Sequence, residues 1–479
     1  MEVSKNKKHI VVFLLLMIFF VGVARATESR VETLGGQGLY LMDDTNIFSN
    51  PALLSNHRNM LRFHLGGVDD FVESSSVTGK AVITRDLHVY GGGTMAIGRA
   101  LTVGIFVGRN PSYEMGGISD VGSGIVDLTT GIDLDGDGND DIPGTFFFPF
   151  EVYGLRGAVD WENPLDVILS YQVGHMAFGI SYYLANGKAG WENEFYAPGV
   201  TEEMEVGATL HGIKFGALYR SARMRPITMW MQWDPYSIVS EYELDDEADI
   251  IEKRCKTTLS GRKFVFGARM HYNLSDTLTV VPAIEWENTS GEVELDDVPD
   301  TDVVFDVLNF TEEDLGIGFE VNSFITGVSL QYKTDRIFAI GSLCLLWSEA
   351  ETTVNIADTG YETVSADKIF SAPVAALGIE FHAKKWLMLR GGVNTTTVWA
   401  TETVEYNEHD VDVEGELVVE DSGLVTVQET TATIGVGLLF GNLTIDTALG
   451  NKFLAGEGGA SEGGIGPNLF SHLDVKYVF

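Results

Sequence analysis

The chain ends in Ser471-His-Leu-Asp-Val-Lys-Tyr-Val-Phe479, and this stretch decides the fold. Its apolar side chains share one parity and its polar side chains share the other: Leu473, Val475, Tyr477 and Phe479 against His472, Asp474 and Lys476. Such alternation is typical of a β-strand with one apolar and one polar face. In a soluble protein the apolar face and the last edge would both be exposed. A closed transmembrane barrel solves both problems, because lipid covers the apolar side and the first strand covers the edge.

The first 26 residues have the features of a secretory signal peptide. Three lysines precede an apolar run over 10–23, and Ala24-Arg-Ala26 is a small-x-small cleavage site. The run is too short for a comfortable membrane span, and residues 27–479 contain no long uncharged apolar run. We therefore expect three regions: a signal peptide over 1–26, an N-terminal segment over 27–58, and a barrel over 59–479.

Composition limits the possible partners. The chain has 31 basic and 69 acidic residues, and its net charge of -38 repels nucleic acid. A hydrophobic fraction of 45% is too high for disorder, and 54 Gly with only 12 Pro suit many strands joined by tight turns. Of the two cysteines, we expect Cys255 in an outer loop and Cys344 within a strand, which predicts no disulfide.

Alternation begins at Met60 and continues to the C-terminus, with short and long connections in turn. Seven short turns are expected near 99–100, 174–175, 222–226, 275–277, 334–335, 383–385 and 441–442. Eight long connections are expected near 66–86, 110–165, 187–207, 243–261, 291–322, 351–371, 401–428 and 450–469. This regular change of loop length is typical of outer-membrane barrels. The fold class is therefore all-β: a transmembrane antiparallel β-barrel of sixteen strands, with fourteen as the alternative count.

Strand parity places several basic and imidazole side chains inside the barrel. They are Arg62, His64, Lys214, Arg269, His271 and Arg390. A basic residue facing lipid at the membrane midplane costs about 2–4 kcal/mol, so these side chains must face water or a partner. Two interpretations remain open. The side chains bind an anionic group such as a carboxylate, or they pair with inward acids or with Asp43 and Asp44 of the N-terminal segment.

The long connections are acidic, and one resembles a calcium loop. Asp133, Asp135, Asp137, Asn139 and Asp141 alternate along the chain, with Gly138 after the third carboxylate. Calcium loops use this pattern, although the twelfth position is Gly144 instead of Glu. The alternative is a solvated acidic tip. Acidic loops elsewhere are either simply solvated or bind divalent ions that bridge to lipopolysaccharide. No essential cofactor is expected.

Catalytic motifs are not found in the sequence. It contains no G-x-S-x-G elbow, no P-loop, no H-E-x-x-H and no Cys/His metal spacing. We therefore expect that the protein is not an enzyme.

The N-terminal segment carries a family resemblance. Leu34-Gly-Gly-Gln-Gly38, Asp43-Asp44 and Asn50-Pro51-Ala52-Leu53 are spaced as turns and irregular backbone. This opening resembles that of the long-chain fatty-acid transporter (FadL-like) family of outer-membrane barrels, and also that of PorV-like barrels. The resemblance implies a hatch inside the lumen that contains Asn50, Pro51 and Ala52, and exit of hydrophobic substrates sideways at a kinked third strand. That family has fourteen strands where this sequence predicts sixteen.

The terminal Phe479 also resembles the ending that outer-membrane proteins present to the barrel assembly machinery. The expected location is therefore the bacterial outer membrane, with its lipid and lipopolysaccharide as partners. Three functions remain open: transport of small hydrophobic or amphipathic molecules through a hatch-plugged barrel, a cation-favouring porin, and a non-transporting anchor or secretion partner. The contents of the barrel distinguish them. The many apolar side chains of residues 27–58 predict that this segment packs inside the lumen.

Overall fold

The computed structural model describes residues 28–74, 81–109, 160–194, 200–220, 226–246, 252–296, 315–356, 361–407, 425–449 and 470–479. The predicted signal peptide over 1–26, the predicted calcium loop over 133–141 and much of the predicted long connections lie outside the described residues. No helix in the described ranges is long and apolar enough to cross a membrane.

The N-terminal segment, defined from here on as residues 28–58, contains three short helical elements. They are the α-helix α2 (Glu28–Thr33) and the 3₁₀-helices η2 (Thr45–Ile47) and η3 (Pro51–Asn56). The expectation of wholly irregular backbone is therefore wrong in part. At η3 the reason is local: the Asn50 side chain accepts a hydrogen bond from the Ala52 amide at 3.1 Å, and Pro51 occupies the first helical position.

All remaining elements of the described residues are strands. In chain order they are β1 (Met60–Ser74), β2 (Ala81–Ile97), β3 (Leu101–Val107), β4 (Asp160–Val173), β5 (Met176–Glu194), β6 (Val200–Tyr219), β7 (Ile227–Asp246), β8 (Glu252–Met270) and β9 (Tyr272–Asn273). They continue as β10 (Leu278–Asp296), β11 (Leu315–Lys333), β12 (Ile337–Ile356), β13 (Tyr361–Lys384), β14 (Leu387–Asn407), β15 (Val425–Phe440), β16 (Leu443–Leu449) and β17 (Phe470–Val478).

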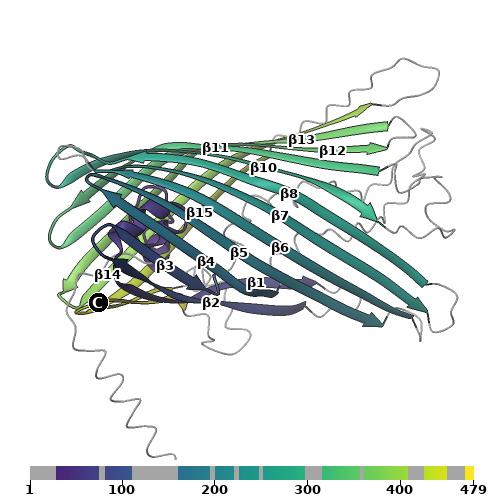
Figure 1. Ribbon diagram of the computed structural model, residues 1–479. Helices are drawn as coiled ribbons and strands as arrows, with labels where there is room; N and C mark the ends of the chain where they lie inside the picture. Colours follow the sequence, from purple (N-terminus) through teal and green to yellow (C-terminus); the bar gives the residue numbers. More distant parts are fainter. Residues whose placement is uncertain are drawn as a thin grey trace, which may run out of the picture.

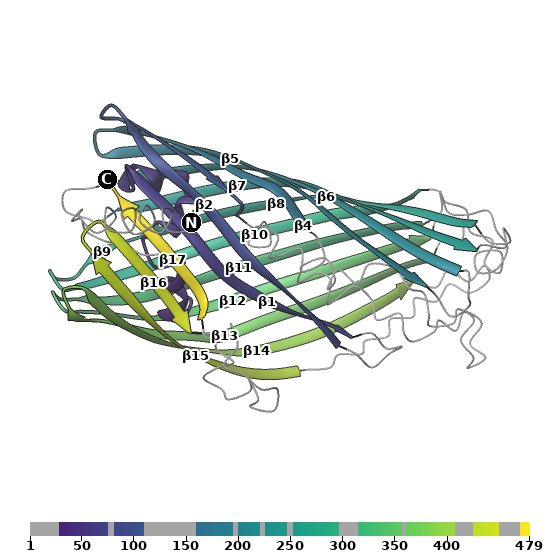
Figure 2. The ribbon, with the colours of Figure 1, turned by 90° about the horizontal axis from the view of Figure 1, so that it is seen from below.

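These strands close into one antiparallel barrel (Figure 1). Each strand pairs with its neighbours in sequence, and β17 pairs with β1 from Met60↔Val478 to Gly66↔His472. The two-residue β9 continues β8 beyond His271, since both pair with β10. The barrel therefore has sixteen strands, as the sequence predicts. Figure 2 shows β16, β17 and β1 side by side at this seam.

The strand faces follow the predicted parity. On β17, Asp474 and Lys476 are buried inside, whereas Phe479 is 58% exposed. Large apolar side chains project outward all round the barrel, among them Phe63, Ile105, Phe178, Phe215, Trp233, Trp286, Leu330, Leu377 and Ile434. This outer surface is the apolar band that a membrane-spanning barrel presents to lipid.

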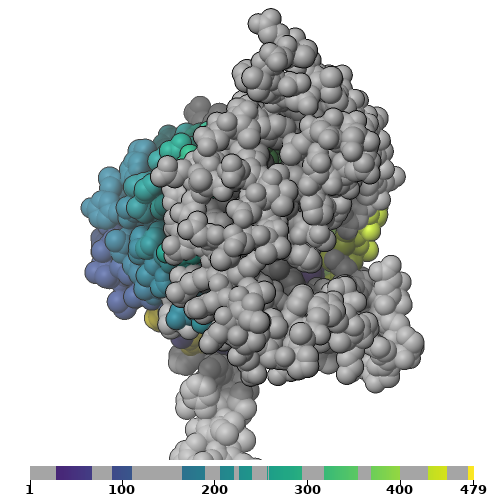
Figure 3. Space-filling view, turned by 90° about the vertical axis from the view of Figure 1, so that its right-hand side faces the viewer, coloured from purple at the N-terminus to yellow at the C-terminus, as the bar shows by residue number. Residues whose placement is uncertain are grey.

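Connection lengths differ from the prediction at one end of the barrel. The short turns gather at the end that also holds the C-terminus, and the strands run from there toward the long connections (Figure 1). Strands such as β5, β6 and β7 have 19 to 20 residues and continue into ranges predicted as loops. Only 195–199 and 247–251 then separate β5 from β6 and β7 from β8. Paired strands keep their backbone hydrogen bonds in water, so polar composition does not end a hairpin at the membrane surface. Figure 3 views the molecule from the end opposite the short turns, with residues of the N-terminal half, coloured purple to teal, on the left.

The cysteine prediction is also wrong in part. Cys255 lies within β8 and not in an outer loop, whereas Cys344 lies within β12 as expected. Cys344 is a free thiol.

Candidate functional site

The N-terminal segment lies inside the barrel, near the end with the short turns (Figure 1). Its apolar side chains form two clusters with inward side chains of the strands. One cluster joins Ile47, Phe48, Leu53 and Leu54 to Tyr90, Phe106, Ile168 and Leu218, and the other joins Leu34, Tyr40 and Leu41 to Val281, Ala283 and Ile340. Leu34, Ile47, Leu53 and Leu54 are fully buried. The segment thus has an apolar core of its own against the barrel wall.

Glycines in the wall let the backbone of the segment approach closely. Gly179 of β5 and Gly216 of β6 are register partners. A Cβ on Gly179 would lie 2.2 Å from the amide nitrogen of Ala52, and one on Gly216 would lie 2.1 Å from Oδ1 of Asn50. Gly179 and Gly216 therefore form a seat for the Asn50-Pro51-Ala52 turn, since any side chain there would collide with it.

A second pair of glycines seats the end of α2. Gly378 of β13 and Gly392 of β14 are also register partners. A Cβ on Gly378 would lie 2.6 Å from the Leu34 carbonyl oxygen, and one on Gly392 would lie 2.4 Å from the Gly35 nitrogen. The wall is thus hollowed at two places that match two turns of the N-terminal segment.

Adding a side chain at the first seat should loosen the segment without opening the barrel. We expect Gly216→Val to destabilise the packed segment by about 1–3 kcal/mol, the usual cost of overpacking. Protease cleavage within residues 28–58 should then become faster, while heat-modifiable gel migration, a sign of a folded barrel, should persist. Gly207→Val is the matched control, because a Cβ there meets only the Val239 oxygen, at 4.0 Å. If both variants were cleaved at the same rate, the role assigned to Gly216 in seating the segment would be wrong.

Asp474 of the closing strand connects the seam to the segment. One of its oxygens lies 3.2 Å from Nη2 of Arg62 and 3.0 Å from Nδ1 of His64, both on β1. The other accepts hydrogen bonds from the Ser29 amide at 2.9 Å and the Ser29 hydroxyl at 2.7 Å. The Tyr90 ring stacks on His64 with 4.8 Å between ring centroids. Two of the six predicted inward residues therefore meet one carboxylate.

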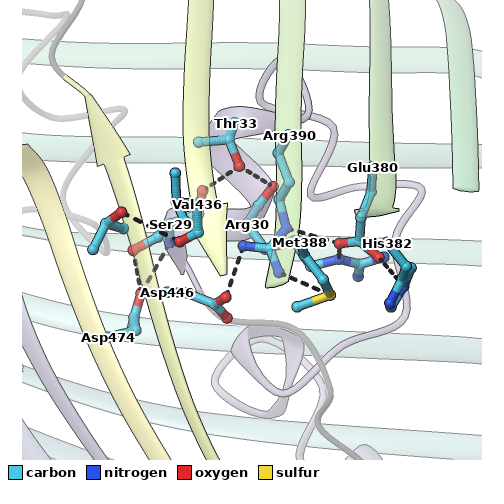
Figure 4. Close-up of polar contacts among 11 residues, drawn as sticks. Ser29, Arg30, Thr33, Glu380, His382, Met388, Arg390, Val436, Asp446 and Asp474 are labelled. Carbon is cyan, nitrogen blue, oxygen red and sulfur yellow. Dashed lines mark hydrogen bonds and ion pairs between the residues drawn. The ribbon is translucent and has the colours of Figure 1, made fainter. Parts of the chain in front are cut away.

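A second ionic cluster holds α2 from the opposite side (Figure 4). Nε of Arg390 lies 2.8 Å from Glu380, and Nη1 of Arg390 lies 2.7 Å from Asp446. Glu380 also forms an ion pair with Arg30 of the segment, whose Nε lies 2.8 Å from the carboxylate. Because Arg390 has two carboxylate partners in the wall, Glu380 is fixed in position for Arg30.

Arg269 binds the backbone of the segment between its helical elements. Its Nη1 donates to the carbonyl oxygens of Gly38 at 3.3 Å, Leu39 at 2.9 Å and also Leu41, and its Nη2 donates to Oδ1 of Asn46 at 3.1 Å. The guanidinium lies 5.7 Å from the Trp230 ring centroid. A planar group with five donors suits this convergence of acceptors. Arg269 is therefore a structural clamp on residues 38–46.

The two neighbouring aspartates have different surroundings. Asp44 lies 2.6 Å from Nζ of Lys476 on β17. Asp43 accepts hydrogen bonds from the Thr45 amide at 3.1 Å and from the Thr45 hydroxyl. Burial, and then the negative charge of Asp44, raise the pKa of the Asp43 carboxyl. Asp44 thus has a basic partner in the wall, but this partner is Lys476 and not one of the six residues predicted to point inward.

On the side of the segment that faces the long connections lies a cavity of about 290 Å³. The segment supplies its floor through Thr45, Phe48 and Ser49, and the wall supplies the rest. The wall residues are Arg109, Lys214, Trp230, Gln232, Lys263, Val265, Glu285 and Glu287. Lys263 lies 2.8 Å from Glu287. The cavity therefore combines two aromatic rings with both basic and acidic groups.

Arg109 closes one side of this cavity. It makes a bidentate pair with Asp166 of β4, at 2.8 and 3.1 Å, and lies 4.6 Å from the Phe48 ring centroid and 4.9 Å from that of Tyr183. The Tyr183 hydroxyl donates to the Arg109 carbonyl oxygen at 3.1 Å. Arg109 thus joins the wall to the segment at the cavity edge.

Beyond the cavity, toward the long connections, the inner wall on β5 to β8 and β11 carries an apolar cluster. This buried cluster contains Tyr183, Ala185, Val206, Ala208, Leu210, Tyr236, Ile238, Leu259, Phe319 and Val321. On β6 the inward face runs from Val206, Ala208 and Leu210 to Lys214 at the cavity. The lumen of a water-filled barrel is polar, so an apolar band on the inner wall requires an explanation.

The predicted residues divide into three groups. The structure brings Asp43, Asp44, Asn50, Pro51 and Ala52 into the segment inside the barrel, and buries Arg62, His64, Lys214, Arg269, His271 and Arg390 on the inner wall. Of these, only Lys214 lines the cavity. Asp133, Asp135, Asp137, Asn139 and Asp141 lie outside the described residues, and the part of the chain that is described holds no cluster able to bind a metal.

Sequence reasoning missed several cavity residues. Lys263 shares the predicted inward parity of Arg269, so the pattern could have included it. Arg109 follows the end of β3, where parity no longer applies. Glu285 and Glu287 lie in the strand expected between the turn near 275–277 and the connection near 291–322, but only basic and imidazole side chains were assigned to the inner face. No sequence signal identifies Trp230 as a cavity residue.

No family model and no curated protein matches the chain significantly. Among solved structures, a FadL homologue of Pseudomonas aeruginosa matches at 10% identity and a TM-score of 0.40, covering 96% of this chain and 100% of its own. The toluene transporter TbuX of Ralstonia pickettii matches at 10% identity and a TM-score of 0.38, covering 94% and 98%. A mutant of the monoaromatic hydrocarbon channel TodX matches at 12% identity and a TM-score of 0.37, covering 95% and 98%. Similarity at this level concerns the fold alone.

Proposed function

We propose that the protein transports small hydrophobic or amphipathic molecules across the outer membrane. The observation that carries this proposal is the content of the lumen. The N-terminal segment occupies the short-turn end and leaves, above Phe48, a cavity of about 290 Å³ below an apolar inner wall. An apolar band along the path does not bind hydrated ions, so a porin does not explain it. A hydrophobic solute, in contrast, lowers its free energy when it leaves water for such a surface.

The cavity favours a small solute with one polar end. Its volume lies near the lower end of the range for ligand pockets, which starts at about 300 Å³. Trp230 and Phe48 offer aromatic faces, while Lys214 and Gln232 offer polar groups. Arg109 and Lys263 have carboxylate neighbours, Asp166 and Glu287. This charge balance favours neutral or weakly polar molecules over strongly charged ones.

The FadL-like resemblance suggests a sideways exit at the third strand. Here β3 is only seven residues long, and it pairs with β2 from Gly91 to Ile97. Toward the long connections, β2 continues beyond this pairing, from Tyr90 back to Ala81. Within the described residues, no strand pairs with this stretch on the edge of β2 that faces β3. Arg109, at the cavity edge, follows directly after this short strand. These features support an exit from the cavity beside β3.

A substitution that fills the apolar inner wall tests the proposal. Ala208 faces inward in the apolar cluster, and its neighbour Gly207 faces outward. Ala208→Phe should lower the initial rate of uptake of a small aromatic such as indole several-fold in cells that express the full chain. Gly207→Phe places the same side chain on the outer surface of the barrel, where Gly207 pairs with Lys188 of β5, and should leave uptake unchanged. Equal uptake by both variants and by cells without the protein would overturn transport.

A further inference from the structure

The outer face of the barrel carries an apolar groove of about 520 Å³ across β11 to β14. Its outward walls include Leu330, Tyr332, Leu377 and Ile379, with exposed side chains. Gly341 and Gly391 contribute no side chain to it, so the barrel wall is locally recessed. Gly391 pairs with Ile379, and Gly341 pairs with Leu377, which places both glycines beside these walls.

This groove lies close to two adjacent short turns. The turn from β11 to β12 follows Lys333, and Tyr332 lines the groove just before it. The turn from β13 to β14 lies between Lys384 and Leu387. The two turns are joined directly, because the His382 amide donates to the Arg336 carbonyl oxygen at 2.9 Å. Since a strand rises about 3.3 Å per residue, the groove begins within about 20 Å of the turns.

The two turns are basic in an acidic protein. The first turn, 333–336, carries Lys333 and Arg336, and the second, 384–386, carries Lys384 and Lys385. Asp335 is the one acidic residue in these two ranges, whereas the whole chain has a net charge of -38. All four basic side chains are exposed, and no ion pair within the described residues involves them. Trp386 is 50% exposed next to Lys385, and aromatic residues of this kind lie at membrane–water interfaces.

We propose that this surface binds one anionic phospholipid from the membrane leaflet on the short-turn side. Lys384, Lys385 and Arg336 hold the phosphate-bearing headgroup, and an acyl chain lies in the groove along Leu377 and Ile379. Clusters of basic residues at the membrane surface attract anionic headgroups, and an acyl chain fits a recess lined with apolar side chains. The basic turns and the apolar groove are separate observations that indicate the same ligand. A free anion would contact only the basic turns, and a neutral oil would contact only the groove.

Native mass spectrometry of the full mature chain, released from vesicles of mixed phosphatidylglycerol and phosphatidylcholine, tests this assignment. The unaltered protein should retain one phosphatidylglycerol in preference to phosphatidylcholine. In the double variant Lys384→Gln with Lys385→Gln, this preference should fall roughly thirtyfold, since each basic residue near an anionic surface contributes about 1 kcal/mol. Its matched control, Arg99→Gln with Lys368→Gln, removes the same charge elsewhere on the barrel and should keep the preference.

A second variant tests the groove independently. Gly391→Leu adds an apolar side chain at the recess, where a Cβ meets nothing closer than the Thr433 oxygen at 3.7 Å. It should lose the retained lipid, whereas Gly207→Leu elsewhere on the outer surface of the barrel should keep it. Heat-modifiable migration verifies that each variant is folded. Equal retention of the two lipids by the unaltered protein, an unchanged preference in the lysine variant, or full retention by Gly391→Leu would each overturn the proposal.

Discussion

Removal of residues 27–56 should convert a nearly closed barrel into a wide aqueous pore. In planar bilayers the intact protein should show low conductance, and the shortened protein should show a conductance roughly tenfold higher or more, since sixteen strands enclose an aqueous channel. The reason is physical occupation: Leu34, Ile47, Leu53 and Leu54 are fully buried between the segment and the inner wall. A large steady conductance of the intact protein would contradict this expectation and favour the porin.

A second variant keeps this test valid if the shortened chain folds poorly. Arg30→Gln with Asp44→Asn removes the ion pairs of the segment with Glu380 and Lys476 while every residue stays in place. We expect brief openings in single-channel records, because the segment then leaves its position more often. A suitable control is Lys368→Gln, which removes the 3.1 Å pair with Glu349 between β12 and β13, away from the segment. Openings of the same frequency in the control would show that the segment is not their cause.

Loss of the terminal aromatic should prevent assembly almost completely. The Tyr477 and Phe479 rings lie parallel, 6.4 Å between centroids, on the lipid face of the closing strand. The Phe479 amide donates to the Asn59 carbonyl oxygen at 2.9 Å, next to β1. Deletion of Phe479 removes this seam contact, and Tyr477→Asp places a carboxylate in the apolar band.

The measurement is the amount of each variant in the outer-membrane fraction relative to the amount synthesised. We expect a large fall for Phe479 deletion and for Tyr477→Asp. Tyr477→Phe keeps the ring on the lipid face and should assemble normally. A normal membrane yield for both damaging changes would remove the role assigned to the terminal strand.

Parity along single strands predicted the barrel well, because it depends only on local alternation. The closing strand is the best example: Asp474 and Lys476 face inward as expected, and Phe479 faces outward. Parity does not name partners, however. Asp474 contacts Ser29, and the two residues are separated by almost the entire chain. Such contacts depend on the register of all strands together, which the turns determine.

The glycine seats show the same limit. Gly179 and Gly216 are ordinary members of two strands in the sequence, and only the register of β5 with β6 brings them side by side. The prediction of the strand lengths was wrong for a different reason. Polar residues beyond the membrane can continue a hairpin as well as form a loop, so composition alone cannot place its end.

The position of Asp474 has a consequence for the order of events in biogenesis. This carboxylate belongs to the closing strand, which emerges long after β1 during synthesis, yet it contacts Arg62 and His64 of β1 and Ser29 of the segment that emerges before both strands. The contacts that hold the interior are therefore complete only when the closing strand arrives. Sealing the wall and completing these contacts are one event, so a chain stalled before β17 would be open at its side and would hold the segment without the contacts of Asp474 and Lys476.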